Sequence, residues 1–464
     1  MHIDTSLLQL INAEQAYFYR AIPIKKEGKT IIFVSDTEKP SNLKKELQVI
    51  FGTTIEIIKE TKENIQKFLS INYRTNTVAN TNELYYNDDF LLQIIHQAKE
   101  IGSSDIHFEI FEFKARVRFR IDGKLIERFI IPLLEYGKIS NRIKILAGAD
   151  ISEKRLPQDG RITLKTTSED FDIRVSFLPT IYGEKIVLRI LNKDTNFINL
   201  ENLGFTKKEL LIYKQSIKKT NGIILLSGPT GSGKTTTLYA TLKRLNTKDK
   251  NILTIEDPVE YTLEGINQVQ LKEGIGLDFA STLRSFLRQD PDIIMVGEIR
   301  DVATANMAIK AALTGHLVLS TIHTNSAWAT ISRLIDMGVP SFLVASTLNI
   351  SIAQRLVRKL CTNCKIEEKI IVDLFPNNFT LPKDLKTHYK AVGCEKCHHT
   401  GYSGRKAIYE IIPIKGELAE KIKHNTFEID DYIKNNDINT LQKNAIELIQ
   451  NGTTSIDEVY SLLL

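Results

Sequence analysis

The sequence predicts a multidomain α/β protein. Its 464 residues exceed what one hydrophobic core usually organises, so we expect several folded units. From about residue 201 onward, short apolar strands alternate with helical segments, which is the pattern of a parallel α/β domain. Between about 90 and 200, "FKARVRFRIDG" alternates apolar and polar residues and ends in an Asp-Gly turn, as a half-buried strand does.

Composition places the chain among soluble globular proteins. Hydrophobic residues make up 42% and charged residues 25%, and the formal net charge is a mild +5. This charge permits contact with nucleic acid or anionic lipid but argues for neither. No apolar run approaches the roughly 20 residues of a membrane helix, and the N-terminus lacks the pattern of a signal peptide. We therefore expect a cytoplasmic chain that reaches a membrane only through partners.

The pattern along the chain divides it into six segments. The first mixes helix-like and strand-like stretches, the second is rich in Asn and Thr, and the last is expected to be mostly helical. The segments are an N-terminal α/β interaction domain (1–71), a linker (72–89), a second N-terminal domain (90–198), the strand–helix domain (199–360), a cysteine-bearing module (361–400) and a helical C-terminal domain (401–464).

The predicted strand in the second domain carries a basic stripe. Its apolar side chains face one way and its cations the other: Ala115, Val117, Phe119 and Ile121 against Lys114, Arg116, Arg118 and Arg120. A solvated strand face explains this stripe. An electrostatic contact with a neighbouring subunit or with a phosphate is the alternative.

A complete phosphate-binding loop follows the first strand of the 199–360 domain. "GPTGSGKT" lies between the apolar "GIILLS" and the helical "TTTLYATLKRL", which are the two contexts that this motif requires. Its glycines let backbone N–H groups converge on phosphate oxygens at a helix N-terminus. Lys234 is expected to reach the outer phosphates and the Thr235 hydroxyl to ligate magnesium. The predicted nucleotide-binding residues are Gly228, Pro229, Thr230, Gly231, Ser232, Gly233, Lys234, Thr235 and Thr236.

Three further segments supply polar residues where ligands of parallel sheets gather, beyond the carboxyl ends of the strands. The acidic candidates are Glu256, Asp257 and Glu260 of "TIEDPVEY" and Glu298 of "GEIRD", and "TGHLVLSTIHTN" supplies His316 and His323. Phosphoryl transfer to water needs a magnesium ligand and a carboxylate that orients the water. The residues alone do not choose among the three carboxylates of the acidic segment.

The four cysteines form two Cys-x-x-Cys pairs. Cys361, Cys364, Cys394 and Cys397 offer four thiolates in two tight turns, which suits tetrahedral zinc, whereas disulfides are unusual in a cytosolic chain. The intervening residues 365–393 exceed the spacing of about 15 to 20 that is common in such motifs. His398 is a substitute ligand, or an outer or exposed residue. A site with four protein ligands leaves no position for a substrate and is expected to be structural.

Taken together, these motifs resemble one family. "GPTGSGKTTTLYATL", "ILTIEDPVEY", "LRSFLRQDPDIIMVGEIRD" and "TGHLVLSTIHTN" are similar to the Walker A, acidic, Walker B and histidine boxes of the ATPases that power type II secretion and type IV pilus assembly. "SDIHFE", "RFRIDG", "RLPQDGR" and "RVSFLPTIYGEKIVLRIL" resemble that family's second N-terminal domain. The resemblance covers about 100 to 464. It implies a RecA-like P-loop domain preceded by a PAS-like domain, with a tetracysteine zinc module.

The resemblance also implies roles for individual residues. The Walker B strand of this family ends in Gly-Glu, so Glu298 would coordinate magnesium, through water. Glu260 matches the family's catalytic glutamate. His323 would sense the γ-phosphate, with His316 in support. The chain departs from the family at Ser326 and Ala407, neither of which touches a catalytic role.

Members of this family work as hexameric rings in which arginines of one subunit complete the neighbour's site. Arg174 and Arg189 match those arginines. Both are expected on the polar side of their strands, because their alternate neighbours are apolar: Ile173, Val175 and Phe177, and Ile186, Leu188 and Ile190.

The predicted function is a hexameric cytoplasmic ATPase that powers pilus or pseudopilus assembly at the inner membrane, with ATP, Mg2+ and Zn2+ as cofactors. Its partners would be platform and docking proteins of the machine, without sequence-specific nucleic acid. The cysteine pairs favour an assembly or secretion motor, because retraction motors of the family lack them. The alternatives are a nucleic-acid-translocating motor, a competence (DNA uptake) pseudopilus ATPase and a nucleotide-binding regulator with little turnover.

Overall fold

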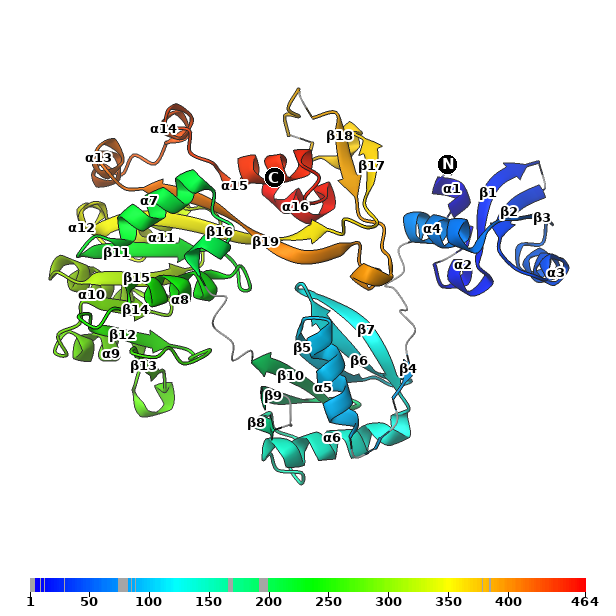
Figure 1. The fold of residues 1–464 in the computed structure, drawn as a ribbon, viewed down its shortest axis with the longest axis horizontal. Helices are drawn as coiled ribbons and strands as arrows, with labels where there is room; N and C mark the ends of the chain where they lie inside the picture. Colours follow the sequence, from blue (N-terminus) through cyan, green and yellow to red (C-terminus); the bar gives the residue numbers. More distant parts are fainter. Residues whose placement is uncertain are drawn as a thin grey trace.

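The structure is a computed structural model that describes residues 5–8, 10–11, 13–28, 30–73, 82–84, 86–87, 89–165, 170–191, 199–377, 379–383 and 385–464. Most of the predicted linker 72–89 lies outside these ranges. Figure 1 shows the arrangement of the described parts, with an N-terminal unit, a second unit and a larger C-terminal part. Among the described helices, none combines the length and the apolar character needed to cross a membrane.

The N-terminal unit is a small three-stranded α/β structure (Figure 1). Strand β2 lies in the middle, antiparallel to β1 and parallel to β3. The elements are α1 (Thr5–Leu8), α2 (Ala13–Tyr19), β1 (Ala21–Glu27), β2 (Thr30–Ser35), α3 (Pro40–Phe51), β3 (Thr54–Lys59) and α4 (Lys62–Asn72).

The second unit is a seven-stranded sheet in the order β4-β7-β6-β5-β10-β9-β8. Helices α5 and α6 pack on one of its faces, and the other face carries charged side chains. The elements are β4 (Asn82–Glu83), α5 (Phe90–Glu100), β5 (Ser103–Ile110), β6 (Ala115–Ile121), β7 (Lys124–Ile131), α6 (Leu133–Ala147), β8 (Gln158–Lys165), β9 (Asp170–Thr180) and β10 (Gly183–Leu191). Asp122 and Gly123 both have positive φ, as the predicted Asp-Gly turn requires.

The third unit is a second seven-stranded sheet in the order β13-β12-β14-β15-β11-β16-β19. All neighbouring strands are parallel except the last pair, β16 and β19. The strands are β11 (Gly222–Ser227), β12 (Ile252–Glu256), β13 (Asn267–Gln270), β14 (Ile293–Val296), β15 (Leu317–Ile322), β16 (Leu348–Leu360) and β19 (Tyr402–Pro413). The short apolar strands expected from about residue 201 onward are thus confirmed, as β11, β12, β14 and β15.

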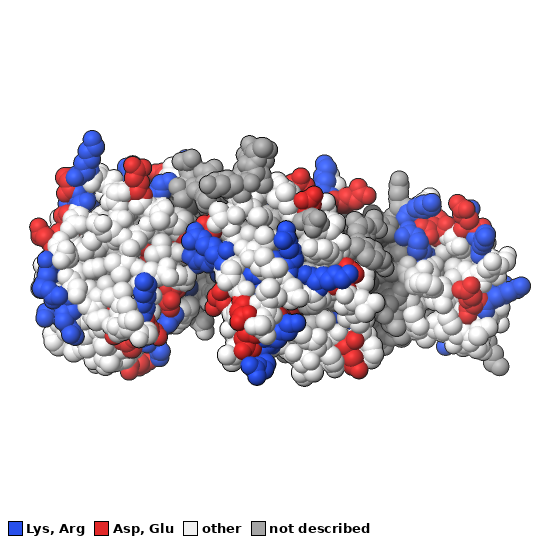
Figure 2. All heavy atoms as spheres, turned by 90° about the horizontal axis from the view of Figure 1, so that it is seen from below, with Lys and Arg blue, Asp and Glu red and all other residues white. Residues whose placement is uncertain are grey.

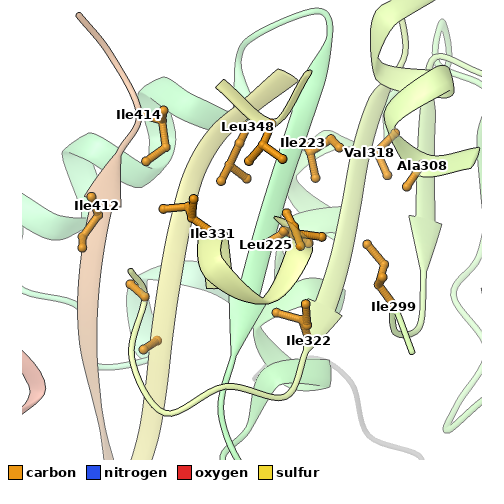
Figure 3. Close-up of a cluster of buried hydrophobic side chains, with 14 of the residues drawn as sticks. Ile223, Leu225, Ile299, Ala308, Val318, Ile322, Ile331, Leu348, Ile412 and Ile414 are labelled. Atoms are coloured by element: carbon orange, nitrogen blue, oxygen red, sulfur yellow. The ribbon is translucent and has the colours of Figure 1, made fainter. Parts of the chain in front are cut away.

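Helices cover both faces of this sheet, which explains why β11 is apolar and buried along its whole length. The helices are α7 (Lys207–Ile217), α8 (Lys234–Leu245), α9 (Phe279–Phe286), α10 (Val302–Leu313), α11 (Ala329–Asp336) and α12 (Ser341–Thr347), with short 3-10 turns at Leu200–Asn202 and Glu273–Ile275. Ile223 and Leu225 face the cluster under α9 to α12 that Figure 3 shows, and Ile224 and Leu226 face α7 and α8. Burial on both sides fixes where β11 ends, and therefore where the phosphate-binding loop begins.

The cysteine-bearing module is an insertion between the paired strands β16 and β19. Its small hairpin consists of β17 (Ile366–Lys369) and β18 (Thr387–Lys390), with 3-10 turns at Val372–Leu374 and Glu395–Cys397. The prediction that 401–464 is mostly helical is wrong for its first part, because Tyr402–Pro413 forms β19. The apolar run in "AIYEII" buries both faces of that strand against the two core clusters. Helices follow only afterwards, as α13 (Glu417–Lys423), α14 (Asp430–Asn435), α15 (Leu441–Gln450) and α16 (Ile456–Leu463).

Candidate active site

The phosphate-binding loop joins the end of β11 to the start of α8. Gly228, Gly231 and Gly233 have φ of 147°, 79° and 88°, a region that favours glycine. A Cβ on Gly228 would lie 2.5 Å from the Gln354 carbonyl oxygen, and one on Gly233 would lie 2.8 Å from the Gln354 Nε2. The loop therefore needs glycine for its backbone shape and for its close approach to β16.

The cation of the loop is held against its own backbone. The Lys234 ammonium donates to the carbonyl oxygens of Gly228 (2.8 Å) and Pro229 (3.1 Å). Burial lowers the pKa of Lys234, and the nearby Glu298 carboxylate opposes that shift. Thr235 and Thr236 are exposed in the first turn of α8. The glycine cradle, the lysine and the exposed hydroxyls fit a nucleotide with its magnesium ion.

The acidic segment after β12 contains three carboxylates in different environments. Glu256 is buried and accepts hydrogen bonds from the Tyr239 hydroxyl, the Thr254 hydroxyl (2.7 Å) and the Gln268 amide (3.1 Å). Asp257 and Glu260 remain partly exposed. Glu256 thus serves the packing of α8 against β12, and of the three carboxylates only the other two are exposed enough to meet a ligand.

Gly297 and Glu298 lie directly after β14. A Cβ at Gly297 would approach the Ile255 carbonyl oxygen to 3.3 Å, so a small residue lets β12 and β14 stay close at this point. The Glu298 carboxylate contacts the Arg300 guanidinium through Oε1 and the His323 imidazole Nε2 through Oε2 (3.2 Å). Glu298 and His323, which the sequence separates by a helix and a strand, therefore meet at the carboxyl edge of the sheet.

His316 lies at the opposite end of β15 from His323. Its ring Nδ1 contacts the Ala311 carbonyl oxygen (2.9 Å) and the Thr314 hydroxyl (3.1 Å), both at the C-terminal end of α10. The prediction that both histidines lie at the carboxyl edge of the sheet is therefore wrong, because His316 precedes β15 and His323 follows it. The hydrogen bonds of the His316 ring are to Ala311 and Thr314, so they do not support a direct role of His316 toward His323.

Arg174 and Arg189 lie on the polar face of the second unit's sheet, as predicted. They are directly opposite each other on β9 and β10. Arg174 Nη1 lies 3.5 Å from Glu260 Oε2, and its Nη2 donates to the Val259 carbonyl oxygen. Arg189 pairs with Asp105 (2.9 Å), and this hydrogen bond raises the pKa of Arg189. Arg174 therefore meets the acidic segment of its own chain.

The basic stripe on β6 is neutralised within its own sheet. Arg116 and Arg118 pair with Glu109 (3.0 and 2.7 Å), Arg116 also with Glu127, and Arg120 with Asp105 (3.3 Å). The cationic partners hold Glu109 charged: burial raises the pKa of Glu109, but the hydrogen bonds from Arg118, Lys185 and Arg116 outweigh burial and lower it to about 2. The stripe is thus an internal ion-pair network rather than a free cationic face.

Two site residues have no counterpart among the sequence predictions. Arg300 contacts Glu298 and also Asp257 Oδ2 (3.5 Å). Arg355 of β16 donates to the carbonyl oxygens of Gln354 (3.0 Å) and Asn325 (2.8 Å), between the phosphate-binding loop and the histidine segment. Arg300 could have been found from its spacing, because residues two apart in an extended segment face the same side. Arg355 carries no such signal.

The four cysteine sulfurs lie together at the base of the insertion. All four Sγ atoms lie within 4.8 Å of one another, and His398 is not part of the group. Backbone N–H groups of Gly393 and Gly401 point at the Sγ atoms of Cys364 and Cys397, each at 3.3 Å. Four converging thiols with N–H donors fit a tetrahedral zinc ion, which would cross-link the two ends of the insertion.

Loss of this cluster is expected to unfold the insertion and not the sheet. The Cys364→Ser variant should lose bound zinc, measured by plasma mass spectrometry, and should become sensitive to protease between 361 and 401. The wild-type chain treated with a chelator should behave the same way, because structural zinc supplies folding free energy. Ser403→Ala, at an exposed position near the start of β19, is the matched control. Protease resistance of a zinc-free chain would contradict the prediction.

Comparison with known proteins identifies the family. The model of the family described as Type II/IV secretion system protein matches residues 84–461. The chain belongs to this family. Over 426 residues it is 44% identical to the type IV pilus assembly ATPase PilB of Myxococcus xanthus, which covers 88% of this chain and 71% of that protein. Over 369 residues it is 44% identical to the type II secretion system protein E of Aeromonas hydrophila, covering 79% of this chain and 73% of that protein.

Solved structures agree with the fold. The Legionella pneumophila ATPase DotB matches with a TM-score of 0.61 at 21% identity, over 82% of this chain and 96% of that one. The pilus retraction motor PilT with bound ADP matches with a TM-score of 0.54 at 25% identity, over 82% and 97%. The resemblance to the secretion ATPase family read from the motifs is thus confirmed, and so is the prediction of an ATPase of that family.

Proposed function

We propose that the chain is a cytoplasmic ATPase that hydrolyses ATP to power assembly of a type IV pilus or a type II secretion pseudopilus at the inner membrane. The observation that carries this proposal is the meeting of three segments at one sheet edge. The phosphate-binding loop, Glu298 with His323, and the acidic segment with Arg174 come from distant parts of the chain. A relative named as a type IV pilus assembly ATPase and one named as a type II secretion system protein support the same function.

Each of these residues then has a chemical task. Lys234 and the loop N–H groups would hold the phosphates of ATP, and Thr235 and Glu298 would hold magnesium, which would neutralise phosphate charge. Glu260 takes a proton from the attacking water. His323 senses the γ-phosphate. Arg174 and Arg189 offset negative charge that develops in the transition state.

The proposal extends to the parts of the machine around this site. The working form is a homohexamer, and the second unit is its PAS-like domain. Motion would arise from rotation of the two halves about 191–204, of which 192–198 lie outside the described residues. Inner-membrane platform and docking proteins would hold the ring peripherally at the membrane, and Zn2+ on the four cysteines would stabilise the insertion.

The cysteine cluster favours an assembly or secretion motor over a retraction motor. The two relatives compared by sequence above are named as a type IV pilus assembly ATPase and a type II secretion system protein, and both are 44% identical to this chain. The comparison therefore supports this class of machine without choosing between its members. A competence pseudopilus motor belongs to the same class.

A nucleic-acid motor is the second candidate and is not favoured. The basic stripe on β6 is the feature that suggests a nucleic-acid contact, but its arginines form ion pairs with carboxylates of the same sheet. On the face shown in Figure 2, basic and acidic side chains are interspersed over all described parts of the chain. A motor that tracks nucleic acid needs a positively charged groove along its backbone.

ATP turnover per chain, measured against protein concentration with and without DNA, tests the proposal. We expect the rate per chain to rise with protein concentration as rings form, because the ring is the working form. Added DNA should leave the rate unchanged. The Lys234→Ala variant should abolish the rate and controls for contaminating ATPases. Stimulation by DNA would favour the nucleic-acid motor instead, and absence of turnover would favour a regulator.

A further inference from the structure

Glu298 and Arg300 project from a short segment that is fixed on all sides. The Gly297 N–H donates to the Ile255 carbonyl oxygen (2.8 Å), and the Thr321 hydroxyl donates to the Gly297 carbonyl oxygen (2.7 Å). Next, the Ile299 N–H donates to the Thr321 carbonyl oxygen (2.9 Å), and the Ile299 side chain is buried in the core (Figure 3). Asp301 caps α10. The two charged side chains that flank Ile299 are thus presented side by side by the fold.

Both carboxylate oxygens of Glu298 are engaged by cationic or ring donors. Arg300 Nη2 contacts Oε1, and His323 Nε2 lies 3.2 Å from Oε2. The same Arg300 Nη2 lies 3.5 Å from Asp257 Oδ2. Arg300 therefore ties the strand end after β14 to the acidic segment after β12, and the hydrogen bond to Glu298 raises its pKa.

Magnesium and Arg300 would compete for the same carboxylate. A divalent cation held by Glu298, directly or through water, needs an oxygen that a guanidinium also occupies, and the two positive charges repel each other at that distance. Asp257 offers Arg300 a second acceptor within reach, so the guanidinium keeps a partner when it leaves Glu298.

We propose that Arg300 is a positioning residue that lowers the magnesium affinity of the site: it occupies the Glu298 carboxylate, and it moves to Asp257 when magnesium and nucleotide bind. This inference rests on the proposed role of Glu298. It differs from an ordinary surface ion pair, which would change the stability of the chain but leave metal affinity as it is.

Binding of Mn2+ to the full-length chain with ADP, measured by electron paramagnetic resonance of free Mn2+, tests this directly. Arg300→Ala should bind Mn2+ about five-fold more tightly than wild type, since a competing partner of Glu298 is gone. Arg300→Lys should lie between the two. Arg244→Ala, which removes one exposed arginine at the far end of α8, is the control and should match wild type. Unchanged or weaker Mn2+ binding in a folded Arg300→Ala chain would overturn the inference.

Glu298→Gln in the same assay separates this inference from the proposed function. If Glu298→Gln weakens Mn2+ binding while Arg300→Ala has no effect, only the proposed role of Arg300 is contradicted. If Glu298→Gln leaves Mn2+ binding unchanged, the proposed role of Glu298 as a magnesium ligand is contradicted, and so is the inference about Arg300. Thermal unfolding of each variant checks that the compared chains are folded.

Discussion

Replacement of Glu260 by glutamine is expected to lower the turnover number for ATP by about a hundred- to ten-thousand-fold, the range that a positioned general base contributes. ATP binding should remain close to wild type, because the amide keeps the size of the side chain and the carboxylate that it replaces pairs with Arg174. Turnover is measured by phosphate release, and binding by titration with a fluorescent nucleotide analogue.

Among the three carboxylates of the acidic segment, the contacts favour Glu260 as the general base. The Glu256 carboxylate is fully engaged by Tyr239, Thr254 and Gln268, so Glu256→Gln should reduce thermal stability more than it changes chemistry. Asp257 faces Arg300, whereas Glu260 faces Arg174. Only Glu260 therefore combines an accessible carboxylate with a cation from the second unit.

Glu264→Gln is the matched control, since Glu264 is an exposed glutamate of the same loop. It should hydrolyse ATP at the wild-type rate. Near wild-type turnover in Glu260→Gln, together with loss in Asp257→Asn, would move the base to Asp257. Near wild-type turnover in both variants would remove the general base from this segment.

The sequence predicts the strand cores and the loop between them because both depend on local patterns. The apolar run Ile293–Val296 matches β14, and the alternation in 115–121 matches β6. The glycine loop needs its flanking strand and helix, and both are present. In each of these cases, neighbours along the chain determine the structure.

The predictions are wrong where contacts between segments distant in the sequence determine the structure. β19 is a strand because β16 lies beside it, although its own stretch is followed by four helices. His316 and His323 occur in one motif, yet the strand between them carries them to opposite ends of the sheet. Glu256 is excluded only because side chains from α8 and β13 fill its hydrogen-bonding positions. Such contacts are set by tertiary packing, which the local pattern does not contain.

Arg174→Ala is expected to lower turnover by about a thousand-fold or more, as loss of an arginine finger does. The guanidinium reaches both Glu260 (3.5 Å) and the backbone of Val259, at the segment that would orient the attacking water. Arg174→Lys should recover little of the activity, because a lysine offers no planar fork to span two acceptors. Arg155→Ala, an exposed arginine of the same unit, is the control and should leave turnover unchanged.

The contact between Arg174 and Glu260 lies within one chain, whereas the family resemblance implies that Arg174 completes a neighbour's site. Mixing two inactive variants distinguishes these arrangements. Arg174→Ala chains keep an intact Lys234, and Lys234→Ala chains keep an intact Arg174. If Arg174 acts on its own chain, as the contact indicates, no active site in a mixed ring contains both groups and turnover stays low.

Recovery of turnover in the mixture would show that Arg174 serves the adjacent subunit, and the contact within one chain would then not be the catalytic one. The same experiment with Arg189→Ala tests the second arginine. Arg189 is paired with Asp105 and is more exposed than Arg174, so we expect a smaller loss from this variant alone. Two arginines directly opposite on adjacent strands repel each other. A phosphate group between β9, β10 and the acidic segment would relieve that repulsion, which is the physical reason to expect both arginines to act on one nucleotide.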